Sequence, residues 1–471
     1  MFDETDYNSW DEAERMALMA HDYYENGQLT MALTQLTEAL QLNPGNSAWH
    51  FNAGLTLDAL EQFDDAIAAY EEAVALSPDD PEILNSLAVD YTRVGLYDLA
   101  ISSFEHIQKI APDFEPCYCN RIITYTEMDM HETAEQMFYL AQQINPDCPI
   151  CFYNIGNSMF CRHNYKRAIW CWQRTALLEP EHPQINYRIA QAYWADGDYE
   201  LAREHFLSEL RESPGDIDVI LDFGIFLLKQ GDTDSATEKF NRILELVPDF
   251  SPAVFYLGET ALVRQDTLKA VELFNTAMKQ NPKLSGPRFR LAQIALEDEN
   301  TDDAKRLLFS ECALDIDDIS VLLAMGSILI ELDEIDYATD CFLRAVNRDE
   351  ENIDAFCSLA VTLAARDEYE GALQFYQHAI ELGCENPQVL ADVAFLYLKT
   401  GQLTLAIDTI NDAIDISGKT EDAVKLKRKI QWAIFRRNLN AALLRFGFYK
   451  VKLFFVRCKC RLGYMFSNIR R

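Results

Sequence analysis

The chain has 471 residues and a formal net charge of −35 at neutral pH. Hydrophobic residues make up 49% and charged residues 25%, a composition that describes a folded, helix-rich protein and excludes a largely disordered one. The acidic N-terminal segment lacks the features of a secretory signal or a transit peptide, and no apolar run reaches about 18 residues. We therefore expect a cytoplasmic protein without a membrane-spanning helix.

The N-terminal segment, residues 1–12, contains a helix-start signal. Ser9 and Glu12 have the spacing of a capping box, in which the Ser side chain and the Glu side chain each accept a backbone N–H of the other residue. We therefore expect the first helix to begin at Ser9.

Residues 13–420 repeat every 34 residues, twelve times and without an insertion. One column of the repeat is always alanine, the column four residues later is bulky, and the column twelve residues before the alanine is small everywhere except at Ile122. An alanine and a bulky residue four positions later lie on one face of a helix. Small residues let two helices approach closely. The alanines are Ala32, Ala66, Ala100, Ala134, Ala168, Ala202, Ala236, Ala270, Ala304, Ala338, Ala372 and Ala406. The bulky residues are Leu36, Tyr70, Phe104, Phe138, Trp172, Phe206, Phe240, Phe274, Leu308, Phe342, Tyr376 and Ile410.

A proline stands twelve residues after the alanine in the first eight repeats, from Pro44 to Pro282. Proline cannot continue the helical hydrogen-bond ladder, so it ends the second helix of each repeat. The last four repeats lack this proline but keep the period.

This pattern resembles the tetratricopeptide repeat (TPR) family, which combines a small residue, an alanine, aromatic residues and a closing proline. The resemblance implies an all-α fold, a right-handed superhelical α-solenoid of about twelve helix-turn-helix repeats over residues 13–420. Each repeat would contain a helix A and a helix B, with the A helices lining a concave groove.

The resemblance also implies that positions 2, 5, 6, 9 and 12 of helix A face the groove. In repeats 5 and 6 these positions combine aromatic rings with amides, which suits an extended peptide or an apolar helix. The alternative is that some of the rings fill the core between repeats. With one asparagine of repeat 4, the candidate groove residues are Asn120, Tyr153, Asn154, Asn157, Phe160, Tyr187, Arg188, Gln191 and Trp194.

No catalytic constellation is present in the sequence. The eight histidines are scattered over different repeats, and none belongs to an HExxH pair or a nucleophile motif, so we expect neither an enzyme nor a cofactor. Four cysteines, Cys117, Cys119, Cys148 and Cys151, could fill a tetrahedral zinc site. Because adjacent helices pack about 8–10 Å apart, we favour buried, reduced thiols for these four and for the remaining cysteines.

The C-terminal part of the sequence reverses the charge of the chain. Residues 421–445 read as a helix that caps the solenoid, and residues 446–471 form a basic, aromatic tail. Together these residues contain 14 Lys and Arg against Glu421 and Asp422. The sequence therefore has two electrostatic parts, an acidic solenoid and a basic tail.

Three uses of the tail remain open. It could attach peripherally to an anionic membrane, dock on an acidic surface of this molecule or of another, or bind nucleic acid, which the acidic solenoid disfavours. The residues expected to make these contacts are Lys450, Lys452, Phe454, Phe455, Arg457, Lys459 and Arg461.

The function we expect is that of a non-catalytic scaffold whose groove binds peptide or helical segments of other proteins, basic segments among them. The second hypothesis is a chaperone-like or assembly accessory subunit of a larger enzyme or secretion complex. Small-molecule substrates and nucleic acid are the least favoured partners.

Overall fold

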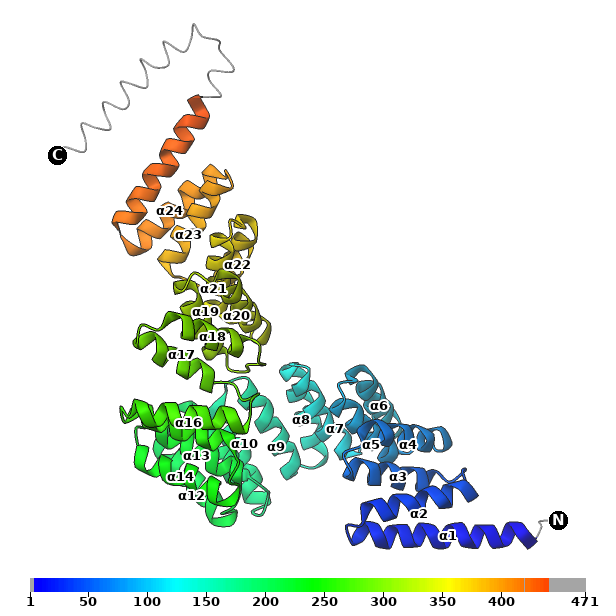
Figure 1. Cartoon of the computed structure of the whole chain (residues 1–471). Coiled ribbons are helices and arrows are strands. Elements are labelled where there is room, and N and C mark those ends of the chain that lie inside the picture. Colours follow the sequence, from blue (N-terminus) through cyan, green and yellow to red (C-terminus); the bar gives the residue numbers. More distant parts are fainter. Residues whose placement is uncertain (1–3, 419, 440–471) are drawn as a thin grey trace. The chain divides into compact units, whose positions relative to one another are not determined.

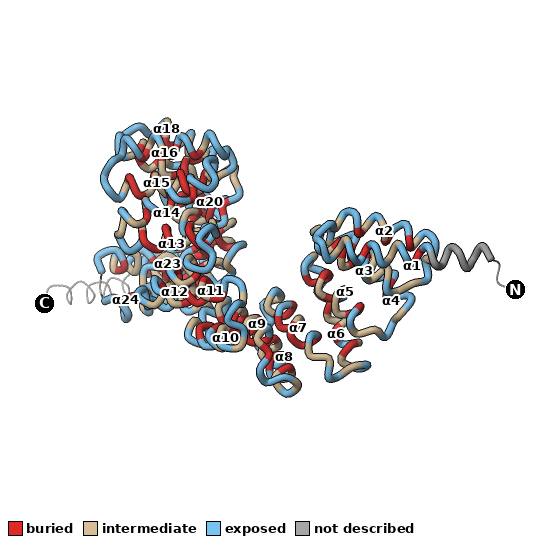
Figure 2. The backbone as a smooth tube through the Cα atoms, turned by 90° about the horizontal axis from the view of Figure 1, so that it is seen from below, coloured by how far each residue is buried: buried red, intermediate tan, exposed pale blue. Residues whose placement is uncertain are grey.

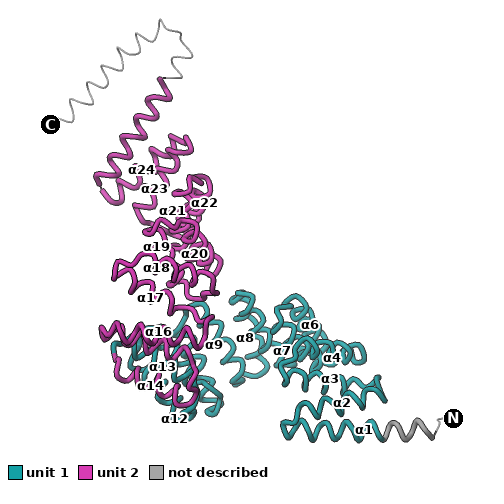
Figure 3. Tube along the Cα trace, in the orientation of Figure 1, with its two compact units in different colours: residues 1–231 teal, residues 232–471 magenta. Residues whose placement is uncertain are grey.

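The computed structural model describes residues 4–418 and 420–439, with side chains from residue 12 onward. It divides into two compact units, Met1–Gly231 and Asp232–Arg471, which are described separately (Figure 3). The described residues form α-helices joined by short turns and contain no strand. The basic tail lies outside them, as do residues 440–445 of the expected capping helix.

The odd-numbered helices are the A helices of the repeats, and the even-numbered helices are the B helices (Figure 1). The A helices are α1 (Glu4–Glu25), α3 (Ser47–Ala59), α5 (Pro81–Arg93), α7 (Glu115–Glu127), α9 (Pro149–Cys161), α11 (Ile185–Asp196), α13 (Ile217–Lys229), α15 (Ser251–Val263), α17 (Pro287–Glu297), α19 (Ile319–Glu331), α21 (Ile353–Ala365) and α23 (Pro387–Lys399). The B helices are α2 (Leu29–Leu42), α4 (Phe63–Leu76), α6 (Tyr97–Ile110), α8 (His131–Ile144), α10 (Tyr165–Leu178), α12 (Tyr199–Glu212), α14 (Thr233–Leu246), α16 (Thr267–Gln280), α18 (Thr301–Cys312), α20 (Ile335–Arg348), α22 (Tyr369–Glu381) and α24 (Leu403–Ser417).

Within each unit every helix packs against the next one along the chain, and A helices of neighbouring repeats also contact each other, as α7 and α9 do. In the second unit, a further helix over residues 421–439 places Ala423 and Ile430 in one apolar cluster with Ala406 and Ile410 of α24. The predicted all-α solenoid of helical hairpins is therefore confirmed.

The three sequence columns form the core of each hairpin. All twelve column alanines are fully buried, and Figure 2 shows the buried residues on the sides where helices meet. A Cβ atom added to Gly54 would lie 2.4 Å from the ring of Tyr70, and one added to Gly156 would lie 2.5 Å from that of Trp172. The small column on helix A thus makes room for the bulky column on helix B.

The turn between helix A and helix B contains one left-handed residue in every repeat. This column runs at the same period of 34, from Gly27 to Gly401, and in seven repeats the residue is not glycine. This column could not be identified from the sequence, because only five glycines mark it among varied polar residues.

The predicted start of the first helix is wrong. Helix α1 begins at Glu4, so Ser9 lies inside the helix and cannot cap it. Acidic residues are stabilising near a helix N-terminus, and the sequence before Ser9 contains acidic residues at positions 3, 4 and 6.

No helix among the described residues has the length and apolar content required to cross a bilayer.

Candidate functional site

The candidate groove residues lie on three successive A helices, α7, α9 and α11. Two of the asparagines join neighbouring helices. The Asn120 side-chain amide donates a hydrogen bond to the Asn85 side-chain oxygen at 3.1 Å, and the Asn154 amide donates one to the backbone oxygen of Cys119 at 3.0 Å. Asn154 is 4% exposed, so its main contacts are within the solenoid.

Tyr187 and Gln191 of α11 bind a carboxylate of the next A helix. The Tyr187 hydroxyl donates to Asp222 Oδ2 at 2.7 Å, and the Gln191 amide donates to the same oxygen at 3.0 Å. Tyr187 is buried, and burial raises the pKa of its hydroxyl above the usual range. These hydrogen bonds therefore join α11 to α13.

Four further groove candidates, Tyr153, Asn157, Phe160 and Trp194, are half-buried. The Tyr153 ring lies tilted against that of His182, with the ring centroids 4.5 Å apart. The Phe160 ring packs on buried Trp172 of α10, and the Trp194 ring packs on buried Phe226 of α13. Each of these aromatic rings divides its surface between the core and the outside of the solenoid. The rings therefore fill part of the core between repeats, and ligand binding by their exposed parts stays a prediction.

Arg188 is a half-buried cation among these residues. Its Nη1 donates to Gln191 Oε1 at 3.4 Å, and its buried Nε has no acceptor within the part of the chain that the structure describes.

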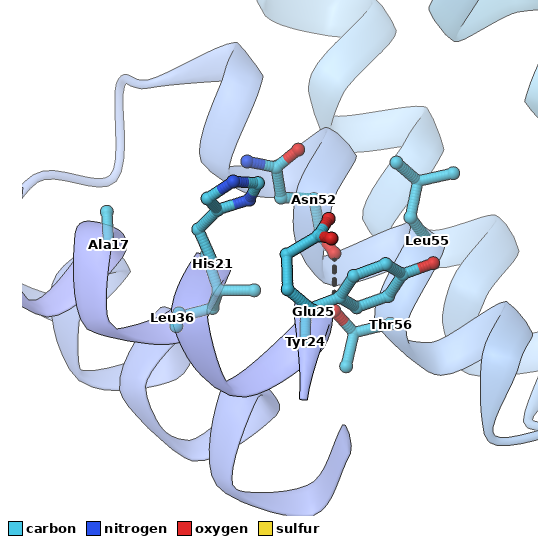
Figure 4. Close-up of a pocket in the computed structure, with 9 residues that line it drawn as sticks. Ala17, His21, Tyr24, Glu25, Leu36, Asn52, Leu55 and Thr56 are labelled. Atoms are coloured by element: carbon cyan, nitrogen blue, oxygen red, sulfur yellow. Dashed lines mark hydrogen bonds between the residues drawn. The ribbon is translucent and has the colours of Figure 1, made fainter. Parts of the chain in front are cut away.

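A pocket of about 220 Å³ opens between α1 and α3 (Figure 4). His21, Tyr24 and Glu25 approach it from α1, and Asn52 and Leu55 approach it from α3. Below them, the buried Thr56 hydroxyl donates to the Asn52 backbone oxygen at 2.7 Å. Ala17, Ala20 and Leu36 also line the pocket, which therefore combines apolar side chains with a histidine, a carboxylate and an amide.

This pocket was not predicted, although the sequence contains a signal for it. Counted from the start of each repeat, His21 and Tyr24 are positions 9 and 12 of the first A helix, and Asn52 and Leu55 are positions 6 and 9 of the second. These are the positions that the family resemblance assigns to the groove. Reading them in repeats 1 and 2, as in repeats 5 and 6, identifies the pocket.

The cysteine candidates are only partly brought together. Cys119 and Cys151 form a disulfide, so the expectation of reduced thiols throughout is wrong for this pair. Cys148 lies beside them, whereas the Cys117 thiol donates to the backbone oxygen of Phe104 on the other side of α7. Glu115, which the sequence analysis did not consider, takes the fourth place in the cluster.

Burial controls the acidity of these thiols. It raises the pKa of Cys117 to about 12 and that of Cys148 to about 11, so both stay protonated at neutral pH when no cation is bound.

Comparison of the chain with models of known families identifies the same kind of repeat. Models described as tetratricopeptide repeat match residues 18–81, 53–113 and 221–285, and another matches residues 353–385. A model of YpiA-like, C-terminal tetratricopeptide repeats matches residues 183–249. The chain is a tetratricopeptide repeat protein.

A curated relative of this TPR protein is the inactive TPR repeat-containing thioredoxin TTL3 of Arabidopsis thaliana, which is 32% identical over 82 residues. That segment is 17% of this chain and spans only 12% of the relative's length.

Two similar solved structures belong to yeast Tom70 and to a tetratricopeptide repeat protein of Parabacteroides merdae. Tom70 is 14% identical with a TM-score of 0.38, and the match covers 92% of this chain and 97% of that one. The Parabacteroides protein is 18% identical with a TM-score of 0.43, over 57% of this chain and 99% of that one. The TPR repeats themselves support a protein-interaction scaffold.

Proposed function

We propose that this TPR protein is a non-catalytic scaffold that binds an extended or helical protein segment along the A helices of its N-terminal unit. The observation that carries the proposal is the pocket at groove positions of repeats 1 and 2. Its volume of about 220 Å³ is below the range of roughly 300–1,000 Å³ that small-molecule sites occupy. A single apolar side chain of a longer ligand suits it better.

The half-buried rings of Tyr153, Phe160 and Trp194 provide further apolar surface on A helices of the same unit. Rigid aromatic side chains supply large contact areas in protein interfaces and are frequent among the residues that dominate binding energy. Residues 1–420 contain 27 cations and 74 acids, so they attract a basic segment, and salt weakens that attraction. The ligand we propose is therefore a basic segment with apolar side chains.

Peptides selected on the full-length protein from a random display library would test this proposal. We expect the Tyr24→Ala and Trp194→Ala variants to weaken the selected peptides roughly tenfold or more, as measured by fluorescence polarisation. Trp170→Ala is the matched control, because Trp170 is 56% exposed on a B helix. Selected peptides that bind both groove variants like the wild type, or that lose binding with the control, would contradict the proposal.

For the basic tail we propose peripheral attachment of a cytoplasmic protein to an anionic membrane. The support is the sequence, in which aromatic residues alternate with cations such as Lys450 and Lys452. Flotation with phosphatidylserine vesicles should depend on residues 446–471, whereas flotation with neutral vesicles should be absent with or without them. Equal flotation of the intact and the shortened protein would remove this part of the proposal.

A further inference from the structure

We propose that Glu115, Cys119, Cys148 and Cys151 form a zinc-binding site that closes on Zn²⁺ when the Cys119–Cys151 disulfide is reduced. Their ligand atoms all lie within 4.8 Å of one another, and the three cysteines are buried. The site would clip helix α7 of repeat 4 to helix α9 of repeat 5.

The spacing of the ligand atoms suits a tetrahedral metal centre. Zn–S bonds of about 2.3 Å and a Zn–O bond of about 2.0 Å place sulfurs about 3.8 Å apart and sulfur and oxygen about 3.5 Å apart. The Cys119 and Cys148 sulfurs are 3.7 Å apart. Glu115 Oε1 lies 3.1 Å from the Cys119 sulfur and 3.5 Å from the Cys151 sulfur.

Two helix segments position these ligands. Glu115 and Cys119 are four residues apart at the start of α7, so both side chains lie on one face of that helix. Cys148 is the N-cap of α9, where its sulfur accepts the Cys151 backbone N–H at 3.3 Å. Backbone N–H groups at a helix N-terminus stabilise a thiolate. The Cys-x-x-Cys spacing of Cys148 and Cys151 is also frequent in zinc sites.

Only the bond between the Cys119 and Cys151 sulfurs must break before the metal can bind. A disulfide uses two cysteines, yet a third sulfur and a carboxylate surround this one. The Cα atoms of Cys119 and Cys151 are 5.1 Å apart, so rotation about their Cα–Cβ bonds separates the sulfurs once the S–S bond is broken. Glu115 is half-buried and gives the ion a path from solvent.

The chemistry of the donors favours zinc. Three thiolates with one carboxylate are the donors of closed, four-coordinate Zn²⁺ sites, whereas Mg²⁺ and Ca²⁺ prefer oxygen ligands. A thiol or phosphine reductant supplies two electrons to the S–S bond, and each sulfur takes up one proton. Zn²⁺ then displaces three protons from the three thiols and binds the ionised Glu115, which leaves a centre with a charge of −2.

Metal binding at this position also bears on the groove surface. Asn154, one of the groove candidates, donates to the backbone oxygen of Cys119. A zinc ion bound to Cys119 and Cys151 fixes the same two helices that this hydrogen bond joins. We therefore expect the metal to hold the groove residues of repeats 4 and 5 in register.

The second unit provides a matched control. Cys312 and Cys341 have sulfurs 3.6 Å apart, nearly the spacing of Cys119 and Cys148, and each pair is separated by 29 residues. No third cysteine, histidine or carboxylate completes a cluster around them within the described residues. We therefore expect no tight zinc binding at this pair.

Zinc binding to the full-length protein tests the proposal. The protein is reduced with a phosphine, stripped with a chelator and titrated with Zn²⁺ against a chromophoric competitor. We expect one tight site per chain and, with Co²⁺ as the probe, a tetrahedral spectrum whose sulfur charge-transfer band corresponds to three thiolates. Cys148→Ser should weaken the site by a hundredfold or more, beyond the roughly 10–100-fold loss that supporting residues alone cause.

Controls separate loss of the site from loss of the fold. Serine is a preferred N-cap residue, so Cys148→Ser should keep the helical circular dichroism of the wild type. Glu115→Gln gives a second variant, for which we expect weaker binding and a spectrum that retains three thiolates. Cys341→Ser should bind zinc like the wild type. Absence of a tight site in the reduced wild type, or equal affinity in Cys148→Ser, would overturn the proposal.

Discussion

Asp90 of α5 is a buried carboxylate whose charge is only partly compensated. It is 1% exposed; one oxygen accepts from Arg93 at 3.0 Å, and the other has no partner among the described residues. Burial, and next the nearby Asp58, raise the pKa of Asp90 to about 6. The folded protein therefore holds this proton more tightly than the unfolded chain does, where the pKa is near 3.8.

This shift predicts a pH dependence of stability. As pH rises from about 4 to about 6, the folded state retains a proton that the unfolded state has lost, so the free energy of unfolding falls. Asp90→Asn removes this loss and should stabilise the protein by roughly 1–3 kcal/mol near neutral pH, but by much less near pH 4. Thermal melting of both proteins across this range measures the effect. A stabilisation that does not vary with pH would contradict the assignment.

Gly156 of α9 shows how tightly the repeat columns fit. An alanine Cβ would lie 2.5 Å from the Trp172 indole nitrogen, which is held in place because it donates to the Tyr153 backbone oxygen at 3.2 Å. Gly156→Ala should therefore destabilise the protein by roughly 1–3 kcal/mol, which outweighs the gain of about 1 kcal/mol in helix propensity.

The matched control for this substitution is Gly371→Ala on α22, where the nearest atom outside the local backbone is 3.7 Å away. That variant should be neutral or up to about 1 kcal/mol more stable in thermal melting. Equal effects of the two substitutions would show that propensity, and not packing, governs the column.

At this scale the sequence predicted the packing columns, since alternation of small and bulky residues follows from helix geometry alone. It did not predict which residues form the cysteine cluster, because that depends on the direction in which each side chain points. Cys117 and Cys119 are two residues apart and point to opposite sides of α7, whereas Glu115 shares the face of Cys119.

The turn between helices A and B places one residue in the left-handed region in every repeat, and glycine occupies that position in five of them. Gly95 has φ +79°, and its N–H and that of Leu96 bond back to the last turn of α5. A side chain in the left-handed region costs roughly 1–2 kcal/mol. Gly95→Ala should therefore lower stability by about that amount, as measured by chemical denaturation.

Gly215 provides the comparison for this prediction. It has no neighbouring atom within 4 Å and no positive φ, so Gly215→Ala should leave stability nearly unchanged. A similar loss for both variants would contradict the prediction, because it would show that the left-handed conformation at Gly95 does not set the effect.

Helix ends could be predicted where proline marks them. Each of the first eight B helices ends two residues before its proline, as α2 does at Leu42 before Pro44. Two A helices begin late, α11 at Ile185 and α17 at Pro287. Pro287 disfavours helical backbone in Gly286 before it, whereas the residue before α11, Gln184, has a left-handed backbone. Buried Glu209 and Glu311 accept hydrogen bonds from backbone N–H groups at these helix starts. The repeat pattern does not predict these contacts.

Across the whole chain, the period of 34 residues was sufficient to predict stacked helical hairpins, but it did not predict their division into two units at Gly231. The pocket between α1 and α3 depends on the size and direction of the side chains at that place. The repeat period alone does not predict it. Charge is the other property visible in the sequence, and it leads to a prediction about salt.

Binding of a selected basic peptide should weaken as salt is raised from about 0.05 to 0.5 M, because screening shortens the range of the acidic field from roughly 14 to 4 Å. Fluorescence polarisation at several salt concentrations measures this change. A neutral peptide of matched length serves as the control, and affinity for the basic peptide that is independent of salt would contradict a role for the net charge.

The central claim is that ligands bind along the A helices. Hydrogen–deuterium exchange of the full-length protein, with and without a selected peptide, tests it most directly. We predict slower exchange in α1 and α3 and in the other A helices that the peptide reaches, with the B helices of the same repeats unchanged. Protection confined to B helices, or none at a saturating peptide concentration, would contradict the account.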